Sequence, residues 1–97
     1  LQRRDATFAR GKSFDTFCPI GPALLVEPDL EVLSVQTRVN GEVKQQGSVS
    51  EMIWNITELL VNASQMMTLE TGDVILTGTP EGVGPLAPGD RLEVEVT

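Results

Sequence analysis

The chain has 97 residues, of which 40% are hydrophobic and 22% are charged. This composition is typical of globular proteins and argues against disorder, and the length allows one small domain or a piece of a larger one. Seven Lys and Arg against 14 Asp and Glu give a net charge of −7. Such a charge disfavours nucleic acid and anionic membranes as partners, because both are bound through an excess of cations.

Two residue counts limit the chemistry of the chain. Histidine is absent, so a His-dependent triad, a His metal site and a His general base are excluded within these residues. The single cysteine, Cys18, cannot form an intramolecular disulfide and fits a reducing, cytoplasmic location; we expect it to be buried. No apolar run approaches the ~18 residues of a membrane span. Because the chain starts at Leu1 and stops in a strand-like pattern, we expect a fragment.

The first 17 residues are basic and aromatic, with four of the seven cations and all three phenylalanines. Basic and aromatic residues together are also found where proteins stack single-stranded nucleic acid, but the acidic remainder of the chain disfavours that alternative. An anion-binding corner or a packed loop fits better. Farther along, the apolar residues 23–26 follow a Pro- and Gly-rich stretch and predict a short strand.

The clearest local signal is a β-hairpin. Residues 33–39 alternate between apolar and polar side chains, Asn40-Gly41 provides the two positive φ angles of a type I′ turn, and residues 42–46 return. Leu33, Val35 and Thr37 are expected to share one face.

A principal helix is predicted after the hairpin. Ser48 or Ser50 is suited to cap a first helical turn, and Thr57 to cap a longer helix that ends near Met66. The apolar residues of this region follow the spacing of one buried stripe, formed by Ile56, Leu59, Leu60, Ala63, Met66 and Met67. A Met-rich stripe also fits a promiscuous docking face, but core packing is the preferred interpretation.

Two further strands are predicted in the C-terminal third. Residues 74–76 form a continuous apolar run, which is typical of a strand buried on both faces. Residues 91–96 alternate strictly, so Leu92, Val94 and Val96 should point inward and Glu93 and Glu95 outward. A solvated face therefore explains this Glu-x-Glu pair better than a metal site does.

A glycine-rich loop separates these two strands. Gly78, Gly82 and Gly84 have neither P-loop nor dinucleotide-binding spacing. One interpretation is that these glycines only form tight turns. The other is that they let the backbone approach a ligand closely, so that hydroxyls such as that of Thr79 contact its carboxylate or ketone oxygen. Both interpretations stay open.

Lys12 is the second candidate for chemistry, since it lies between aromatic residues. A partly desolvated lysine polarises a carbonyl or stabilises an enolate. The alternative is an ordinary surface lysine whose alkyl stem covers apolar neighbours.

Three segments, in order, resemble the C-terminal domain of the fumarylacetoacetate hydrolase family: GKSFDTFCPIGP at 11–22, VNGEVKQQGSVSEMIWNITELL at 39–60 and MTLETGDVILTGTPEGVGPLAPGDRLEVEV at 67–96. Within the family, the chain looks closest to bacterial 2-hydroxyhepta-2,4-diene-1,7-dioate isomerases and 5-oxopent-3-ene-1,2,5-tricarboxylate decarboxylases. The resemblance implies a mostly β, α+β fold, a mixed β-sheet roll with one principal helix. Residues 1–97 would be the C-terminal portion of a single catalytic domain.

The resemblance also implies a metal site. In the family a divalent cation, Mg²⁺ or Mn²⁺, is held by two glutamates of a Glu-x-Glu pair and by an aspartate, all upstream of the segment at 11–22. Four positions of this chain match the family pattern. Gln2 and Thr79 match substrate-binding residues, Lys12 matches a catalytic lysine, and Lys12 and Thr16 match the inner edge of the metal site.

The activity implied by the resemblance belongs to the full-length protein. The substrates would be small 2-oxo, 2,4-dioxo or hydroxydienoic acids of aromatic catabolism. The reaction would be C–C bond hydrolysis, isomerisation or decarboxylation through a metal-bound enolate. The enzyme would be a homodimer. Residues 1–97 alone are expected to be inactive, because the carboxylate ligands lie upstream. The alternative is a non-catalytic β-rich fragment or interaction module. An aspartate just before Leu1 and a Glu-x-Glu pair farther back would favour the enzyme.

Overall fold

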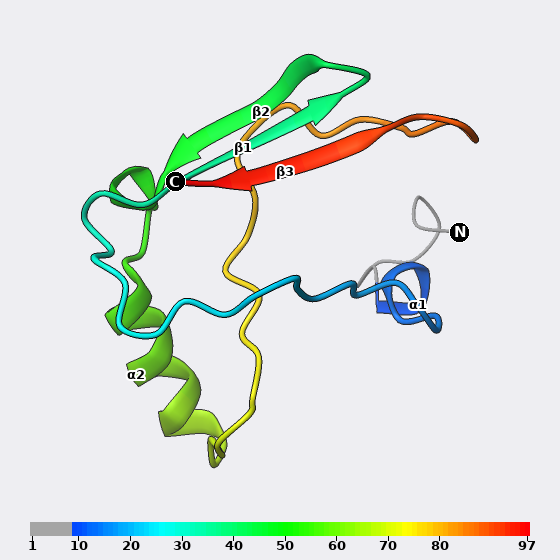
Figure 1. Cartoon of the computed structure of the whole chain (residues 1–97). Coiled ribbons are helices and arrows are strands. Elements are labelled where there is room, and N and C mark those ends of the chain that lie inside the picture. Colours follow the sequence, from blue (N-terminus) through cyan, green and yellow to red (C-terminus); the bar gives the residue numbers. More distant parts are fainter. Residues whose placement is uncertain (1–8) are drawn as a thin grey trace.

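A computed structural model describes residues 9–97. Its regular structure consists of three strands and few helices, with one principal helix (Figure 1). The elements are α1 (Ala9–Lys12), β1 (Ser34–Val39), β2 (Glu42–Ser48), the 3₁₀ turn η2 (Val49–Glu51), α2 (Ile56–Met66) and β3 (Leu92–Val96). The expected α+β class with one principal helix is confirmed. A mixed sheet was expected, whereas both strand pairings of the described residues are antiparallel.

The sheet has the order β2-β1-β3, so β1 is hydrogen-bonded on both sides. The predicted hairpin is confirmed: β1 and β2 are joined by Asn40 and Gly41, whose φ angles of 53° and 82° are both positive, as a type I′ turn requires. Between Thr37 and Arg38 the register shifts, because Thr37 faces Gln45 whereas Arg38 faces Val43. Lys44 is thus the extra residue of a β-bulge on β2.

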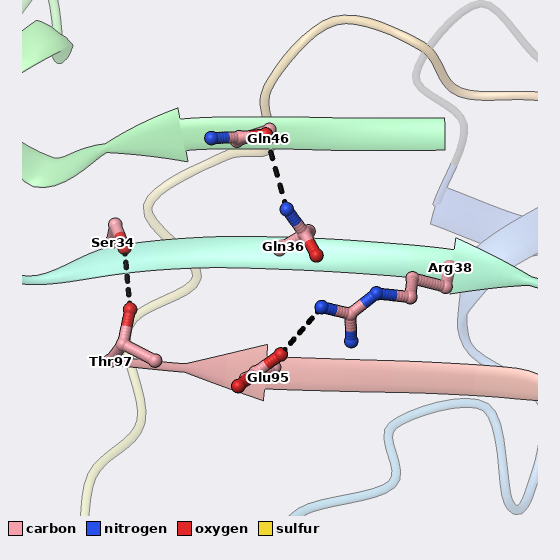
Figure 2. A network of polar contacts seen from close by, with 6 residues as sticks. All are labelled: Ser34, Gln36, Arg38, Gln46, Glu95 and Thr97. Atoms are coloured by element: carbon pink, nitrogen blue, oxygen red, sulfur yellow. Dashed lines mark hydrogen bonds and ion pairs between the residues drawn. The ribbon is translucent and has the colours of Figure 1, made fainter. Parts of the chain in front are cut away.

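The two faces of the sheet differ in polarity. On one face, Gln36 Nε2 donates to Gln46 Oε1 at 3.1 Å, and Arg38 forms an ion pair with Glu95 at 2.8 Å (Figure 2). On the other face, the paired residues are Val35 with Val96, Thr37 with Val94 and Val39 with Leu92. The alternation of the sequence therefore sorts side chains as predicted, with Glu95 among the polar set.

Asn40 also connects the hairpin turn to the start of β3. Its Nδ2 donates to Asp90 Oδ1 at 2.9 Å, and its Oδ1 accepts from the backbone N–H of Arg91 at 2.9 Å. The backbone N–H of Ala87, followed by the amide of Asn40, lowers the pKa of Asp90 below its ordinary value of 3.8. Because the Asp90 carboxyl has a lower pKa in the folded protein than in the unfolded chain, its contacts stabilise the fold. This contribution is present at a pH above 3.8 and is lost as the pH falls through the folded pKa.

Helix α2 begins two residues earlier than the predicted cap implies. Asn55, not Thr57, is the N-cap: Asn55 Oδ1 accepts from the N–H of Glu58 at 2.8 Å, and the Glu58 carboxylate accepts from the N–H of Asn55 at 3.0 Å. This reciprocal capping box places Thr57 inside the first turn, so its predicted role was wrong. The prediction of Ser48 as a cap is confirmed, since it precedes η2 with a capping box completed by Glu51.

None of residues 9–97 is fully buried. The predicted buried stripe on α2 is only half-covered: Ile56, Leu59 and Ala63 are half-buried, whereas Met66 and Met67 are 71% and 59% exposed. The apolar residues of β3, Leu92, Val94 and Val96, are 50–62% exposed. The expected full burial was wrong in residues 9–97, because within them no second layer of structure packs over α2 or over the apolar face of the sheet. None of the described helices is long and apolar enough to cross a membrane.

Two predicted strands are also absent from the described part of the chain. Residues 23–26 and 74–76 have no strand assignment, and Leu24 and Leu76 are 85% and 80% exposed. A strand needs a neighbour with which to form its ladder, and residues 9–97 provide none for these runs. Cys18, expected to be buried, is exposed for the same lack of covering structure.

The Asn40 contacts give a testable order of stabilities. Asn40→Ala loses both side-chain hydrogen bonds and keeps a Cβ in the left-handed region without the short polar side chain that lets Asn adopt it, a conformation that costs roughly 1–2 kcal/mol per residue. Asn40→Gly loses the same bonds without that strain. We expect the unfolding midpoint in urea to fall from the unmodified protein to Asn40→Gly and further to Asn40→Ala. Equal midpoints for all three proteins would contradict the proposed link between the turn and β3.

Candidate functional site

A groove of about 650 Å³ lies beside the apolar face of the sheet. Val35 and Gly47 border it from the sheet, and Trp54 and Leu59 border it from the start of α2 and the segment before it. The opposite wall is the first half of the glycine-rich loop, residues 77–81. The polar residues around it include Thr79 and two glutamates, Glu51 and Glu81. Mostly apolar walls with a few polar groups are typical of sites for small molecules.

Gln45 holds the glycine-rich loop against β2. Its Nε2 lies 2.7 Å from Thr79 Oγ1 and 2.7 Å from the carbonyl oxygen of Pro80. Gln45 faces Thr37 in the register, so it lies on the same side of the sheet as Val35, which borders the groove. Gln45 itself does not border the groove, but the loop that it holds does. The loop thereby covers part of an edge strand, which would otherwise present unpaired backbone groups to solvent.

Two glycines allow the loop to approach this closely. A Cβ on Gly47 would lie 2.9 Å from Pro80 Cγ, and a Cβ on Gly82 would collide with the backbone carbonyl of Lys44. Gly82 also has a φ of +100°, which side chains rarely adopt. Gly82 thus allows a close backbone approach within the protein, to Lys44 at the bulge of β2. The approach of the loop to a ligand stays a prediction.

The predicted site residues occupy separate parts of the described structure. Thr79 lies in the groove wall. Lys12 is the exposed last residue of α1, and Thr16 is exposed with a φ of 67°. In Figure 1, α1 lies to one side of the sheet and of α2. Within residues 9–97 no hydrogen bond joins Lys12 or Thr16 to Thr79, and Gln2 lies outside the described residues.

Sequence reasoning missed Gln45, Gly47 and Trp54 as parts of this site. Two signals were available: Gly47 interrupts a strand pattern, which often marks a close backbone approach, and a glutamine on an apolar face needs a partner. The bulge at Lys44 weakened the second signal, because it decides which of two adjacent glutamines lies on that face.

The described residues do not form a metal site by themselves. Among residues 9–97 no group of three or more Cys, Asp or Glu side chains is arranged to hold an ion. Glu93 is instead paired with Arg91 at 2.7 Å and Glu95 with Arg38 at 2.8 Å. Both carboxylates thus have cationic partners, in agreement with the interpretation of this Glu-x-Glu pair as a polar face.

Comparison with known proteins identifies the family. Residues 1–97 match the family described as fumarylacetoacetate (FAA) hydrolase C-terminal. The chain belongs to this family. It is 47% identical to oxaloacetate tautomerase YisK of Bacillus subtilis over 106 aligned positions, which cover 99% of the chain and 35% of that protein.

Solved structures of fumarylacetoacetate hydrolase family members show the same arrangement. A 2-hydroxyhepta-2,4-diene-1,7-dioate isomerase from Mycobacterium marinum matches with a TM-score of 0.92 and 43% identity, over 98% of this chain and 38% of that one. A maleylpyruvate hydrolase from Sphingobium sp. SYK-6, in complex with manganese(II) and pyruvate, matches with a TM-score of 0.82 and 38% identity, over 86% and 33%. The resemblance seen in the sequence is thus confirmed, and the chain spans about a third to two-fifths of the relatives' length.

The contact between Gly82 and Lys44 can be tested with a matched pair of variants. Gly82→Ala adds a Cβ that collides with backbone and imposes a strained φ, at a cost of about 1–3 kcal/mol, so we expect a lower urea midpoint. Gly84→Ala, in the same loop, adds a Cβ with nothing within 4 Å and should leave the midpoint unchanged. Equal effects of the two substitutions would show that the loop does not dock on β2.

Proposed function

We propose that residues 1–97 form the C-terminal portion of a single catalytic domain in an enzyme that acts on small 2-oxo, 2,4-dioxo or hydroxydienoic acids. The observation that carries this proposal is the family match over the whole chain, together with relatives whose names state tautomerase, isomerase and hydrolase activities. The three compounds named for these relatives are small acids with a 2-oxo or 2-hydroxydiene group. The common chemistry is enolisation next to a carboxylate.

The surface of the chain supports the single-domain part of the proposal. Its accessible surface is 8739 Å², whereas a compact monomer of this mass exposes about 5,400 Å². Its radius of gyration is 15.2 Å, compared with about 13 Å for a compact chain of ~100 residues. The accessible surface is therefore roughly 3,300 Å² larger than that of a compact monomer. A standard interface buries only ~800 Å² on each partner. Further residues of the same domain, packed over this surface, explain the difference better than a binding partner alone does.

Thr79 is suited to bind an anionic oxygen of such a substrate. Its Oγ1 accepts a hydrogen bond from Gln45, so its own hydroxyl hydrogen remains available to donate. The hydroxyl is exposed on the wall of the groove. We assign to Thr79 the binding of a substrate carboxylate or ketone oxygen, with Gln2 orienting the same molecule.

Lys12 supplies the positive charge that an enolate requires. Within residues 9–97 its ammonium group forms no ion pair, so no described carboxylate neutralises it. A fixed cation beside a developing enolate oxygen lowers the barrier to the reaction. The general base that moves the proton is not a histidine of these 97 residues, since they contain none.

A divalent cation, Mg²⁺ or Mn²⁺, belongs to the proposal for the complete protein. The related maleylpyruvate hydrolase holds manganese(II), but the described residues lack a suitable set of carboxylates. The ligands would therefore come from outside residues 9–97, and Thr16 would lie only at the edge of the site.

An assay of three reactions tests the proposal. The complete protein should tautomerise oxaloacetate, isomerise 2-hydroxyhepta-2,4-diene-1,7-dioate or hydrolyse maleylpyruvate when Mg²⁺ or Mn²⁺ is supplied, and EDTA should remove the activity. Residues 1–97 expressed alone should be inactive. A complete protein that is folded, loaded with metal and inactive on all three acids would contradict the proposed function.

The role of Lys12 is tested against the other lysine of the chain. Lys12→Ala should lower kcat by about 10²–10³-fold, the effect of removing one group that stabilises the transition state, with little change in the urea midpoint. Lys44→Ala removes an exposed ion pair with Glu42, which is worth little, and should retain full kcat. Equal rates for Lys12→Ala and the unmodified protein would remove Lys12 from the site.

A further inference from the structure

The direction of the Gln45–Thr79 hydrogen bond is fixed by a third group, the carbonyl oxygen of Pro80. A carbonyl oxygen only accepts, so the Gln45 atom 2.7 Å from it must be the amide nitrogen. The same nitrogen lies 2.7 Å from Thr79 Oγ1 and donates its second hydrogen there. Gln45 therefore uses both of its N–H groups on adjacent residues of the loop.

The two sides of this contact differ in how firmly they are held. Gln45 lies within β2 and is paired with Thr37 of the central strand. Thr79 and Pro80 belong to no strand or helix, and Thr79 is exposed whereas Gln45 and Pro80 are half-buried. Gln45 is thus the fixed group, and the loop takes its position from it.

We propose that Gln45 is a positioning residue that holds Thr79 as a hydrogen-bond donor toward the substrate, an inference that rests on the proposed function. Because Gln45 occupies an acceptor position of the Thr79 oxygen, the hydroxyl hydrogen is directed away from Gln45. A donor fixed before binding favours an anionic oxygen, since no reorientation is needed when the substrate enters. Gln45 itself makes no contact with the reacting atoms.

The test substitutes Gln45 and, as a control, a glutamine of α2. Gln45→Glu has nearly the same shape, but its carboxylate only accepts; Thr79 would then donate to it and lose its hydrogen for the substrate. We expect KM to rise about tenfold to hundredfold, the range for a hydrogen bond to a charged group, with a smaller change in kcat. Gln65→Glu makes the same charge change at an exposed residue of α2 that does not border the groove, and it should leave KM unchanged.

A double-mutant cycle with Thr79→Val separates positioning from charge repulsion. If Gln45 acts through Thr79, Gln45→Glu should add little to the KM of Thr79→Val. An additive effect would show that the new carboxylate repels the substrate directly, and it would overturn the proposal. Gln45→Met removes both donors without adding charge and should also raise KM, so the inference does not depend on Gln45→Glu folding.

The remaining outcomes distinguish a failure of the role of Gln45 from a failure of the proposed function. If the unmodified protein turns over the acids and Thr79→Val raises KM, but neither Gln45 variant does, the positioning role is wrong and the proposed function stands. If Thr79→Val leaves KM unchanged, the role of Gln45 fails together with that of Thr79. If the unmodified protein is inactive on all three acids, the proposed function fails first and the inference with it.

Discussion

The backbone ladders on both sides of β1 are the constraint on which the rest of the described structure depends. No residue from 9 to 97 is buried, so a hydrophobic core does not hold the elements together. The sheet instead joins segments that are far apart in the chain, because β1 pairs with β2 next to it and with β3 more than 50 residues later. The turn at Asn40, the loop contacts of Gln45 and the capped turn after β2 are all fixed relative to these strands.

Local signals in the sequence predicted the elements that depend on local chemistry. The Asn40-Gly41 turn, the alternation of 91–96 and the end of α2 are set by φ preferences and by the period of the side chains, and each was predicted correctly. The cap of α2 was misplaced by two residues, since Asn55 and Glu58 form a reciprocal capping box that competes successfully with Thr57.

Predictions that depend on burial were less accurate. Residues 23–26, residues 74–76 and the stripe along α2 carry apolar patterns, yet none of their residues is fully buried in the described structure. An apolar pattern records what a segment packs against in its complete fold, whether or not that neighbour is part of the same 97 residues. The candidate site divides in the same way: Thr79 could be predicted from its loop, whereas Gln45 depends on the bulge at Lys44, which only the register of β2 reveals.

The open apolar face and the groove are parts of one surface. Val35 borders the groove and faces Val96 across the ladder, and Val94 and Leu92 continue the same face along β3. On the proposed function, the remainder of the domain covers this face and thereby also removes water from the groove. Desolvation strengthens a hydrogen bond between Thr79 and an anionic oxygen, because the local dielectric constant falls. The exposed valines of β3 and the donor at Thr79 therefore follow from one requirement, a covering layer on the apolar side of the sheet.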